Sequence, residues 1–173
     1  MAKTRKFITY RSLERPYTRF SKYKKKCYVR ARPVNKIVRY DMGVDKKFDY
    51  TLNLCSKSAL QIRDIAIESA RQVSNKFLEK KLGRTNYKLK LMIVPHHVLR
   101  ENPLAAGAGA DRMSTGMSHP FGKPIGVAAQ VRKGQTLMSV RVDSTHLELG
   151  KEAITKAKHK FPCSCSLAVI KNH

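Results

Sequence analysis

Acidic residues are scarce in this sequence. It contains 12 Asp and Glu against 36 Lys and Arg, so the formal net charge of the 173 residues is +24. An excess of this size repels itself, and a polyanionic partner is its best explanation. Nucleic acid is the commonest polyanion, and an anionic membrane surface is the less common one. The charge balance therefore favours a nucleic-acid-binding protein.

Long apolar segments are also missing. No run of about 18 apolar residues occurs, so we expect no membrane-spanning helix. The basic start at residues 1–6 leads into no apolar stretch of the kind that a signal peptide needs. No basic amphipathic helix of the membrane-surface type is evident either. These absences rank a membrane-surface protein last among the candidates and favour a cytoplasmic one.

Cysteines are few, and the four present do not make a disulfide framework. We expect reduced thiols, as in cytosolic proteins. Cys163 and Cys165 face the same side of a predicted strand, and buried small hydrophobic side chains are the favoured interpretation. A structural zinc site is the alternative, but Cys27 and Cys55 lie on other segments and no Cys-x-x-Cys pair occurs. We therefore expect no metal.

Motifs of enzymes are incomplete. Gly107–Gly109 begins like a dinucleotide fingerprint, but Arg112 occupies the third glycine position and no Walker lysine motif exists. His96 and His97 would point to opposite faces of a strand, which leaves one in the core or an interface and one exposed. We expect no catalytic residues, cofactor or small-molecule substrate. The alternative is an RNA-processing or RNA-modifying enzyme that uses His96, His97 and Asp111.

The first part of the chain is a basic extension. Residues 1–39 contain 14 Lys and Arg but only one acid, Glu14, with tyrosines interleaved among the cations. Pro16 and Pro33 interrupt any helix, and alone in water such a segment should be disordered or loosely held. Against RNA, its cations can neutralise phosphates while its rings stack on unpaired bases. We predict an RNA-binding extension over residues 1–34 and a single domain over 35–173.

The apolar periodicity of residues 35–173 predicts an α+β fold. The pattern includes two capping boxes, Ser58–Gln61 and Thr145–Glu148, each of which is expected to open a helix. The first helix should end at Gly83 and the second at Pro162. Alternating apolar residues predict the strands, which are expected at 36–41, 48–55, 87–99, 125–131, 136–142 and 164–170. Because strand hairpins accompany two helices, we predict a two-layer sandwich with a mixed or antiparallel sheet.

A long loop is predicted between residues 100 and 124, because this stretch has no apolar period of two or of 3.6. Loops of this length in compact domains are functional or disordered. Its apolar side chains need burial, whereas Arg112 and Lys123 need an anion, so a partner outside the domain should order it. Small residues at 105–110 would let the backbone approach RNA closely.

The loop motifs resemble those of a known family. Ala108-Gly-Ala-Asp-Arg112, Thr115-Gly-Met117 and Phe121-Gly-Lys-Pro124 are similar to the signature of the universal large-subunit ribosomal protein sixteen family, called ten-e in archaea and eukaryotes. The resemblance covers nearly the whole chain, including Asp41-Met-Gly43 and Lys156–Pro162. The longer C-terminal extension of the eukaryotic branch and the glycine-lysine-rich loop of the bacterial branch are missing, so the archaeal type is expected.

The resemblance implies a hammerhead-like α+β sandwich and a structural, non-catalytic role in the large ribosomal subunit. It implies binding to large-subunit ribosomal RNA near the peptidyl transferase centre, with 5S RNA and other ribosomal proteins nearby. It also implies that the loop at 101–123 helps to position transfer RNA. The residues expected to lie near transfer RNA are Ala108, Gly109, Ala110, Asp111, Arg112, Met113, Thr115, Gly116 and Met117.

Ribosomal RNA contacts are expected mainly from the cations of the extension and of the loop ends. Arginine can bind a phosphate bidentately, whereas lysine acts as a point charge. Such contacts are spread over many side chains, and they release counterions as they form. The predicted RNA-binding residues are Arg5, Lys6, Arg11, Arg15, Arg19, Lys24, Lys25, Lys26, Arg30, Arg32, Arg100 and Lys123.

Overall fold

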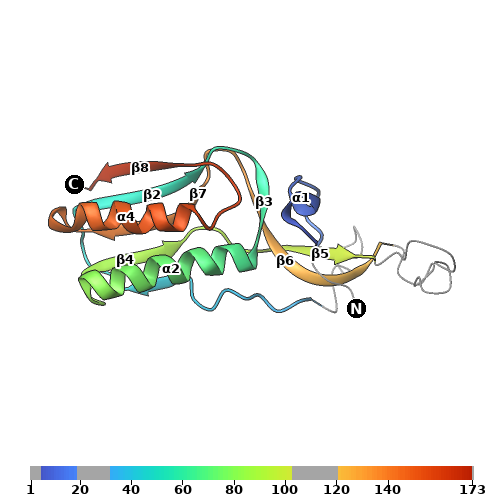
Figure 1. The fold of residues 1–173 in the computed structure, drawn as a ribbon, viewed down its shortest axis with the longest axis horizontal. Coiled ribbons are helices and arrows are strands. Elements are labelled where there is room, and N and C mark those ends of the chain that lie inside the picture. The colour runs from blue at the N-terminus through green and yellow to red at the C-terminus, as the bar shows by residue number, and fades with distance from the viewer. Residues whose placement is uncertain (1–4, 19–31, 103–120, 173) are drawn as a thin grey trace.

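The computed structural model describes residues 5–18, 32–102 and 121–172, which form two sheets and a helix layer (Figure 1). The helices are α1 (Phe7–Tyr10), α2 (Asp64–Leu82), the short 3-10 helix η3 (Ser144–His146) and α4 (Leu147–Lys158). The strands are β1 (Asp41–Gly43), β2 (Tyr50–Ser56), β3 (Leu60–Arg63), β4 (Tyr87–Leu91), β5 (His97–Glu101), β6 (Lys123–Val131), β7 (Thr136–Val142) and β8 (Cys165–Lys171).

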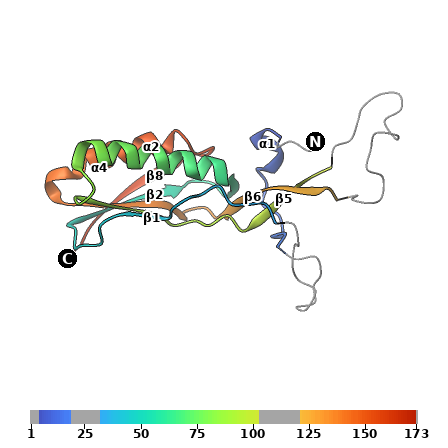
Figure 2. The same cartoon turned by 90° about the horizontal axis from the view of Figure 1, so that it is seen from below.

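The larger sheet has the order β1-β4-β7-β2-β8, and all its neighbours pair antiparallel. Helices α2 and α4 both cover one face of this sheet (Figure 2). Their apolar sides bury Ile67 and Ile154 against Leu52, Leu89 and Val140 of the strands. This single apolar layer confirms the predicted α+β class.

The smaller sheet has the order β3-β6-β5 and is also antiparallel. Strand β6 is nine residues long and runs from this sheet toward the tight turn that leads into β7 of the larger sheet. Strands β5 and β6 project away from the helix layer, beyond the start of α2 (Figure 1). The two ends of the molecule are therefore different, with α2 and α4 over one end and the β5–β6 hairpin extending from the other.

The predicted capping box at Ser58–Gln61 is wrong. Leu60 and Ile62 alternate as a strand, pairing with Val131 and Ala129 of β6, and α2 begins only at Asp64. The local Ser-x-x-Gln pattern was overridden by burial, because Leu60 and Ile62 lie in the core. The predicted end of α2 is confirmed, since Gly83 follows it with φ of 72° and donates its N–H to Glu79 O.

The capping box at Thr145–Glu148 is also wrong in detail, because α4 begins at Leu147 with no side-chain cap. The Asp49 carboxylate instead accepts the Ser144 N–H at 2.9 Å, and this bond holds the start of the short 3-10 helix. A residue distant in sequence, directly before β2, thus supplies the acceptor that the local pattern assigned to a neighbour.

The strand expected at residues 36–41 is mostly absent, because regular pairing covers only Asp41 within that span. Two carboxylates of α2 accept hydrogen bonds from backbone N–H groups of this segment instead. Asp64 accepts the Lys36 N–H at 3.1 Å, and Glu68 accepts the Val38 N–H at 3.4 Å. The predicted interruption near Pro95 is confirmed, since β4 and β5 lie on either side of it in different sheets.

Gly150 explains how closely α4 approaches the sheet. A Cβ at this position would lie 2.6 Å from Leu52 Cδ1 and 3.1 Å from Val142 Cγ2. Both neighbours are fully buried, so neither can move without disturbing the core. The helix-propensity cost of glycine is therefore offset by close packing.

We predict that Gly150→Val lowers the free energy of unfolding by about 2 kcal/mol, because overpacking strains the core. Denaturant unfolding followed by circular dichroism measures the change. Thr155→Val on the exposed side of α4 is the control, with an expected change within about 0.5 kcal/mol. Equal effects of the two substitutions would refute the packing role of Gly150.

Candidate nucleic-acid interface

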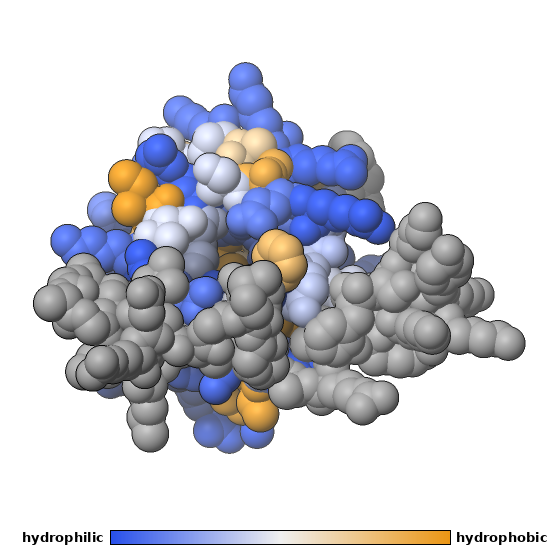
Figure 3. Space-filling view, turned by 90° about the vertical axis from the view of Figure 1, so that its right-hand side faces the viewer, coloured by the Kyte–Doolittle hydropathy of each residue, from blue (hydrophilic) through white to orange (hydrophobic). Residues whose placement is uncertain are grey.

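The N-terminal segment lies against the smaller sheet, at the end of the molecule from which β5 and β6 project (Figure 1). Tyr10 is buried there with Leu99 and Ala128. The part of the predicted extension that the structure describes is thus packed on the domain, while the boundary at residue 34 stays a prediction. Figure 3 faces this end, where the visible coloured surface is mostly hydrophilic with a few small apolar patches.

Gln61 holds the N-terminal segment in place. This side chain is 1% exposed, and its amide donates to the carbonyl oxygens of Tyr10 and Ser12. The Gln61 backbone N–H donates to Arg11 O at 3.1 Å. Gln130 on the neighbouring strand donates to Glu14 O at 2.8 Å. Because buried amides must be hydrogen-bonded, these contacts fix the path of residues 10–14.

His97 fixes the next part of the segment. Its Nδ1 accepts the Tyr17 N–H at 2.9 Å, and Tyr17 O accepts the Val98 N–H at 3.1 Å. Burial lowers the pKa of His97, with a smaller opposing effect from Glu14. The ring is therefore neutral near pH 7, which is the state that an accepting Nδ1 requires.

Glu101 joins the segment to the end of β5. Its carboxylate accepts from the side chain of Arg5 and, at 3.3 Å, from the hydroxyl of Tyr10. The same hydroxyl accepts the Arg5 N–H at 3.2 Å. Glu101 is almost buried whereas the Arg5 side chain is 55% exposed. Glu101 is thus already neutralised, and the guanidinium that neutralises it still reaches solvent.

Arg100 lies beside two aromatic rings. Its guanidinium carbon is 3.9 Å from the centroid of the Tyr17 ring and 6.0 Å from that of Phe121. Contacts of this kind bring a cation to the negative face of a ring. Phe121 is 78% exposed, directly before β6. The stack joins three segments that are far apart in the sequence.

The predicted RNA-binding residues within the described ranges gather at this end. Lys6, Arg11, Arg15 and Lys123 are exposed, and Arg32 donates to Pro95 O at 3.3 Å. The remaining predicted sites lie outside the described residues: Arg19, Lys24, Lys25, Lys26 and Arg30 of the extension, and Ala108, Gly109, Ala110, Asp111, Arg112, Met113, Thr115, Gly116 and Met117 of the loop.

The histidine pair shows the expected division, with His97 buried and His96 partly exposed. His96 Nδ1 lies 3.2 Å from Val94 O, while His97 contacts the N-terminal segment. The two rings thus have separate partners. The third member of the alternative catalytic set, Asp111, lies outside the described residues.

The thiols of Cys163 and Cys165 lie 3.6 Å apart at the start of β8. Cys165 is buried and Cys163 is half-buried. The hydrogen bond from Cys165 lowers the pKa of the Cys163 thiol to about 7 and raises the pKa of Cys165. Across residues 5–18, 32–102 and 121–172, no group of three His, Cys, Asp or Glu side chains could hold a metal ion.

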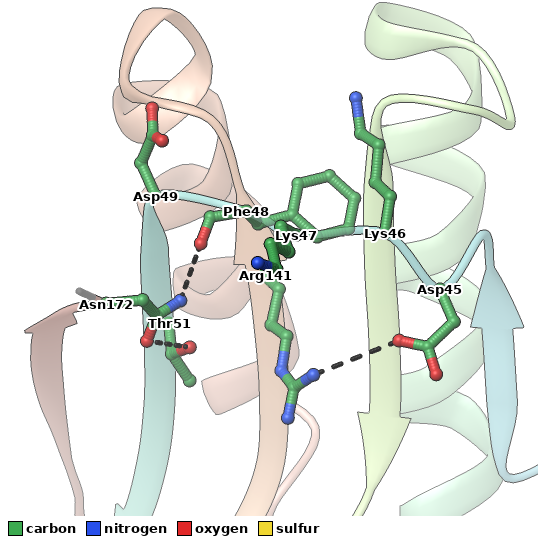
Figure 4. Close-up of a pocket in the computed structure, with 8 residues that line it drawn as sticks. All are labelled: Asp45, Lys46, Lys47, Phe48, Asp49, Thr51, Arg141 and Asn172. Atoms are coloured by element: carbon green, nitrogen blue, oxygen red, sulfur yellow. Dashed lines mark hydrogen bonds and ion pairs between the residues drawn. The ribbon is translucent and has the colours of Figure 1, made fainter.

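The opposite end of the molecule carries paired acids around a shallow pocket (Figure 4). Asp45 lies 2.6 Å from Lys88 Nζ and 4.0 Å from Arg141. The hydrogen bond and charge of Lys88 hold the pKa of Asp45 below its usual value. Asp143 pairs with Lys46 at 3.1 Å. Because Asp45 and Asp143 each neutralise a nearby cation, this end attracts a polyanion less than the end with β5 and β6 does.

Sequence reasoning missed the residues that place the N-terminal segment. The Ser-x-x-Gln pattern predicts a helix cap at Gln61, and no local pattern indicates a role for Gln130. Their partners are the carbonyls of Tyr10, Ser12 and Glu14, and a contact so distant in sequence leaves no local pattern. Two glutamines among the apolar residues of predicted elements are the sequence signal that could have indicated it.

Comparison with known proteins identifies relatives along nearly the whole chain. Residues 17–168 match the family described as ribosomal protein L16p/L10e. The large ribosomal subunit protein uL16 of Archaeoglobus fulgidus is 46% identical over 95% of this chain and 91% of its own length. The proteins of the same description from Methanococcus maripaludis and Staphylothermus marinus are 42% and 47% identical over 94% and 86% of this chain.

Among the described residues, no helix is both long enough and apolar enough to cross a membrane.

We predict that the free energy of unfolding falls as the pH drops below about 6.5, because the unfolded chain then protonates His97 while burial resists protonation in the fold. The stability is present above the ordinary histidine pKa and is lost below it. His97→Asn keeps an acceptor near the position of Nδ1 and should flatten this pH dependence. Urea unfolding at several pH values measures it.

His159→Asn is the matched control, because His159 is exposed at the end of α4 and should leave the pH dependence unchanged. Parallel stability profiles for the wild-type chain and His97→Asn would contradict the neutral, accepting state of His97.

Proposed function

Since the chain belongs to the ribosomal protein L16p/L10e family and is a large-subunit ribosomal protein, we propose that it binds large-subunit RNA through its hairpin end. We define the hairpin end as β5, β6 and residues 5–18. On this proposal the chain is a structural component of a cytoplasmic ribonucleoprotein, seated near the peptidyl transferase centre, with 5S RNA and other ribosomal proteins as neighbours.

The observation that carries the proposal is the unequal distribution of paired charge. At the hairpin end, Lys6, Arg11, Arg15 and Lys123 are exposed, and the nearly buried acid Glu101 is paired with Arg5. Glu14 is the other acid of this end, so its cations still outnumber its acids. At the opposite end, the acids lie beside the cations of the sheet. RNA phosphates bind most favourably to cations that have no carboxylate beside them, since binding then releases counterions without breaking ion pairs.

Transfer RNA is the second partner that we propose, through residues 101–123. The described ends of this stretch are Glu101 and Lys123, which pair across the β5–β6 hairpin. The smaller sheet anchors that hairpin and aims it away from the helix layer (Figure 2). A segment that begins and ends on such a support can reach beyond the RNA that seats the protein.

Membership of a ribosomal protein family also confirms the expectation that the chain is not an enzyme. The separate partners of His96 and His97 agree with this conclusion.

We predict that removing three cations of the hairpin end weakens binding to large-subunit RNA and its salt dependence. The variant carries glutamine at Lys6, Arg15 and Lys123. The slope of log affinity against log salt should become less steep by about 0.7 to 0.9 for each lost phosphate contact. Filter binding over a salt series measures the slope.

The control removes three exposed cations from the far half of α2, replacing Lys76, Lys80 and Lys81 by glutamine. It changes the net charge by the same amount and should leave the slope nearly unchanged. If the two triple variants lose affinity and slope equally, binding depends on total charge and the proposed interface is wrong.

We predict that a photo-crosslinking residue at Met113 joins transfer RNA in assembled, translating ribosomes. Met92 provides the matched control, because its side chain is 48% exposed just beyond the end of β4. Crosslinked RNA is identified by primer extension and sequencing. Crosslinks to transfer RNA from neither position, or equally from both, would contradict the proposed reach of residues 101–123.

A further inference from the structure

We propose that the exposed ring of Phe121, backed by Arg100 and Tyr17, is a stacking site for one unpaired nucleobase of RNA. The inference rests on the proposed function, because it takes RNA as the partner. It adds a specific site and a chemistry, since contact with a base is distinct from neutralisation of phosphates.

The geometry provides a ring with a cation beside it. The Arg100 guanidinium lies 3.9 Å from the Tyr17 centroid and 6.0 Å from the Phe121 centroid. Tyr17 is half-buried, whereas Phe121 is 78% exposed. Tyr17 thus serves as the support of the guanidinium, and Phe121 is the ring that a ligand can reach.

The base of the hairpin holds Phe121 in place. The next residue, Gly122, has a φ of 88°, a backbone angle that residues other than glycine rarely adopt. A Cβ there would lie 2.6 Å from the Glu101 carbonyl carbon, so β5 and the turn touch backbone to backbone. Residues 123 and 124 then enter the β6 ladder opposite Glu101 and Arg100. The ring is therefore carried on a constrained turn directly beside the guanidinium.

The support on the other side is fixed as well. Tyr17 is bound through its backbone to His97 and Val98 of β5. Arg100 lies on the same strand, so the backbones that carry the guanidinium and the Tyr17 ring are fixed relative to each other. A prearranged stack of this kind loses little conformational entropy when a base binds.

The exposure of Phe121 requires an explanation. Among the described large apolar side chains, its exposed fraction is exceeded only by Val34 at 85%. An exposed aromatic ring beside arginine could contact an apolar protein surface or a nucleobase. The charge of its surroundings favours the base, because Arg5, Lys6 and Lys123 attract the phosphates that flank it. Every base offers a π face, so the site needs no particular sequence.

The absence of tryptophan from the sequence makes a direct test possible. Phe121→Trp introduces a single indole, whose emission is quenched when a base stacks on it. The probes are oligo(A) of about eight nucleotides, large-subunit RNA, and inorganic polyphosphate as a polyanion without bases. We expect quenching by both RNAs and none by polyphosphate.

The control is Val169→Trp on β8, away from the hairpin end, where the side chain is 44% exposed. Its emission should respond to none of the probes. Quenching of Phe121→Trp by polyphosphate as strongly as by RNA would overturn the proposal, because charge alone would then account for it. Binding of large-subunit RNA without any quenching would overturn it while leaving the proposed function intact.

Affinity provides a second measurement. Phe121→Leu keeps an apolar side chain and removes the π face, so the dissociation constant for oligo(A) should rise about tenfold. Phe121→Tyr keeps the ring and should bind within about twofold of the wild-type chain. Equal losses for both substitutions, or no loss for Phe121→Leu, would contradict stacking. Failure of the wild-type chain to bind large-subunit RNA would instead refute the proposed function.

Discussion

Hydrogen bonds from two buried side chains keep the N-terminal segment on the smaller sheet, and the arrangement of the hairpin end depends on them. The side-chain amide of Gln61 donates hydrogen bonds to the carbonyl oxygens of residues 10 and 12, and His97 Nδ1 accepts the N–H of Tyr17. Without this attachment, the cations of the segment would repel those of β5 and β6. The uncharged state of His97 matters for the same reason, because another positive charge would add to the repulsion.

The attachment has a functional consequence. It places Tyr17 beneath Arg100 and Arg5 beside Glu101, so cations from two distant parts of the chain share one surface. A partner then meets charges already set in position rather than a fluctuating tail. Such an arrangement costs less entropy on binding than ordering a free segment would. The helix layer and the larger sheet form the stable body that carries this surface.

Much of the fold could be predicted from local patterns, because alternation or helical spacing of apolar residues reflects which face is buried. That logic placed β2, β6, β7 and α2, and the loop motifs indicated the family. It failed at Gln61 and at Asp49, where the decisive partners are far along the chain. The stack of Arg100 on Tyr17 was unpredictable for the same reason, although Arg100 was expected at the interface.

The central claim is that the hairpin end, and not the helix layer, faces ribosomal RNA. An electron cryo-microscopy map of the large subunit containing this chain tests it most directly. The account predicts phosphates against residues 5–18 and the β5–β6 hairpin, with the exposed sides of α2 and α4 making few RNA contacts. RNA seated along α2 and α4, with the hairpin end away from any phosphate, would contradict it.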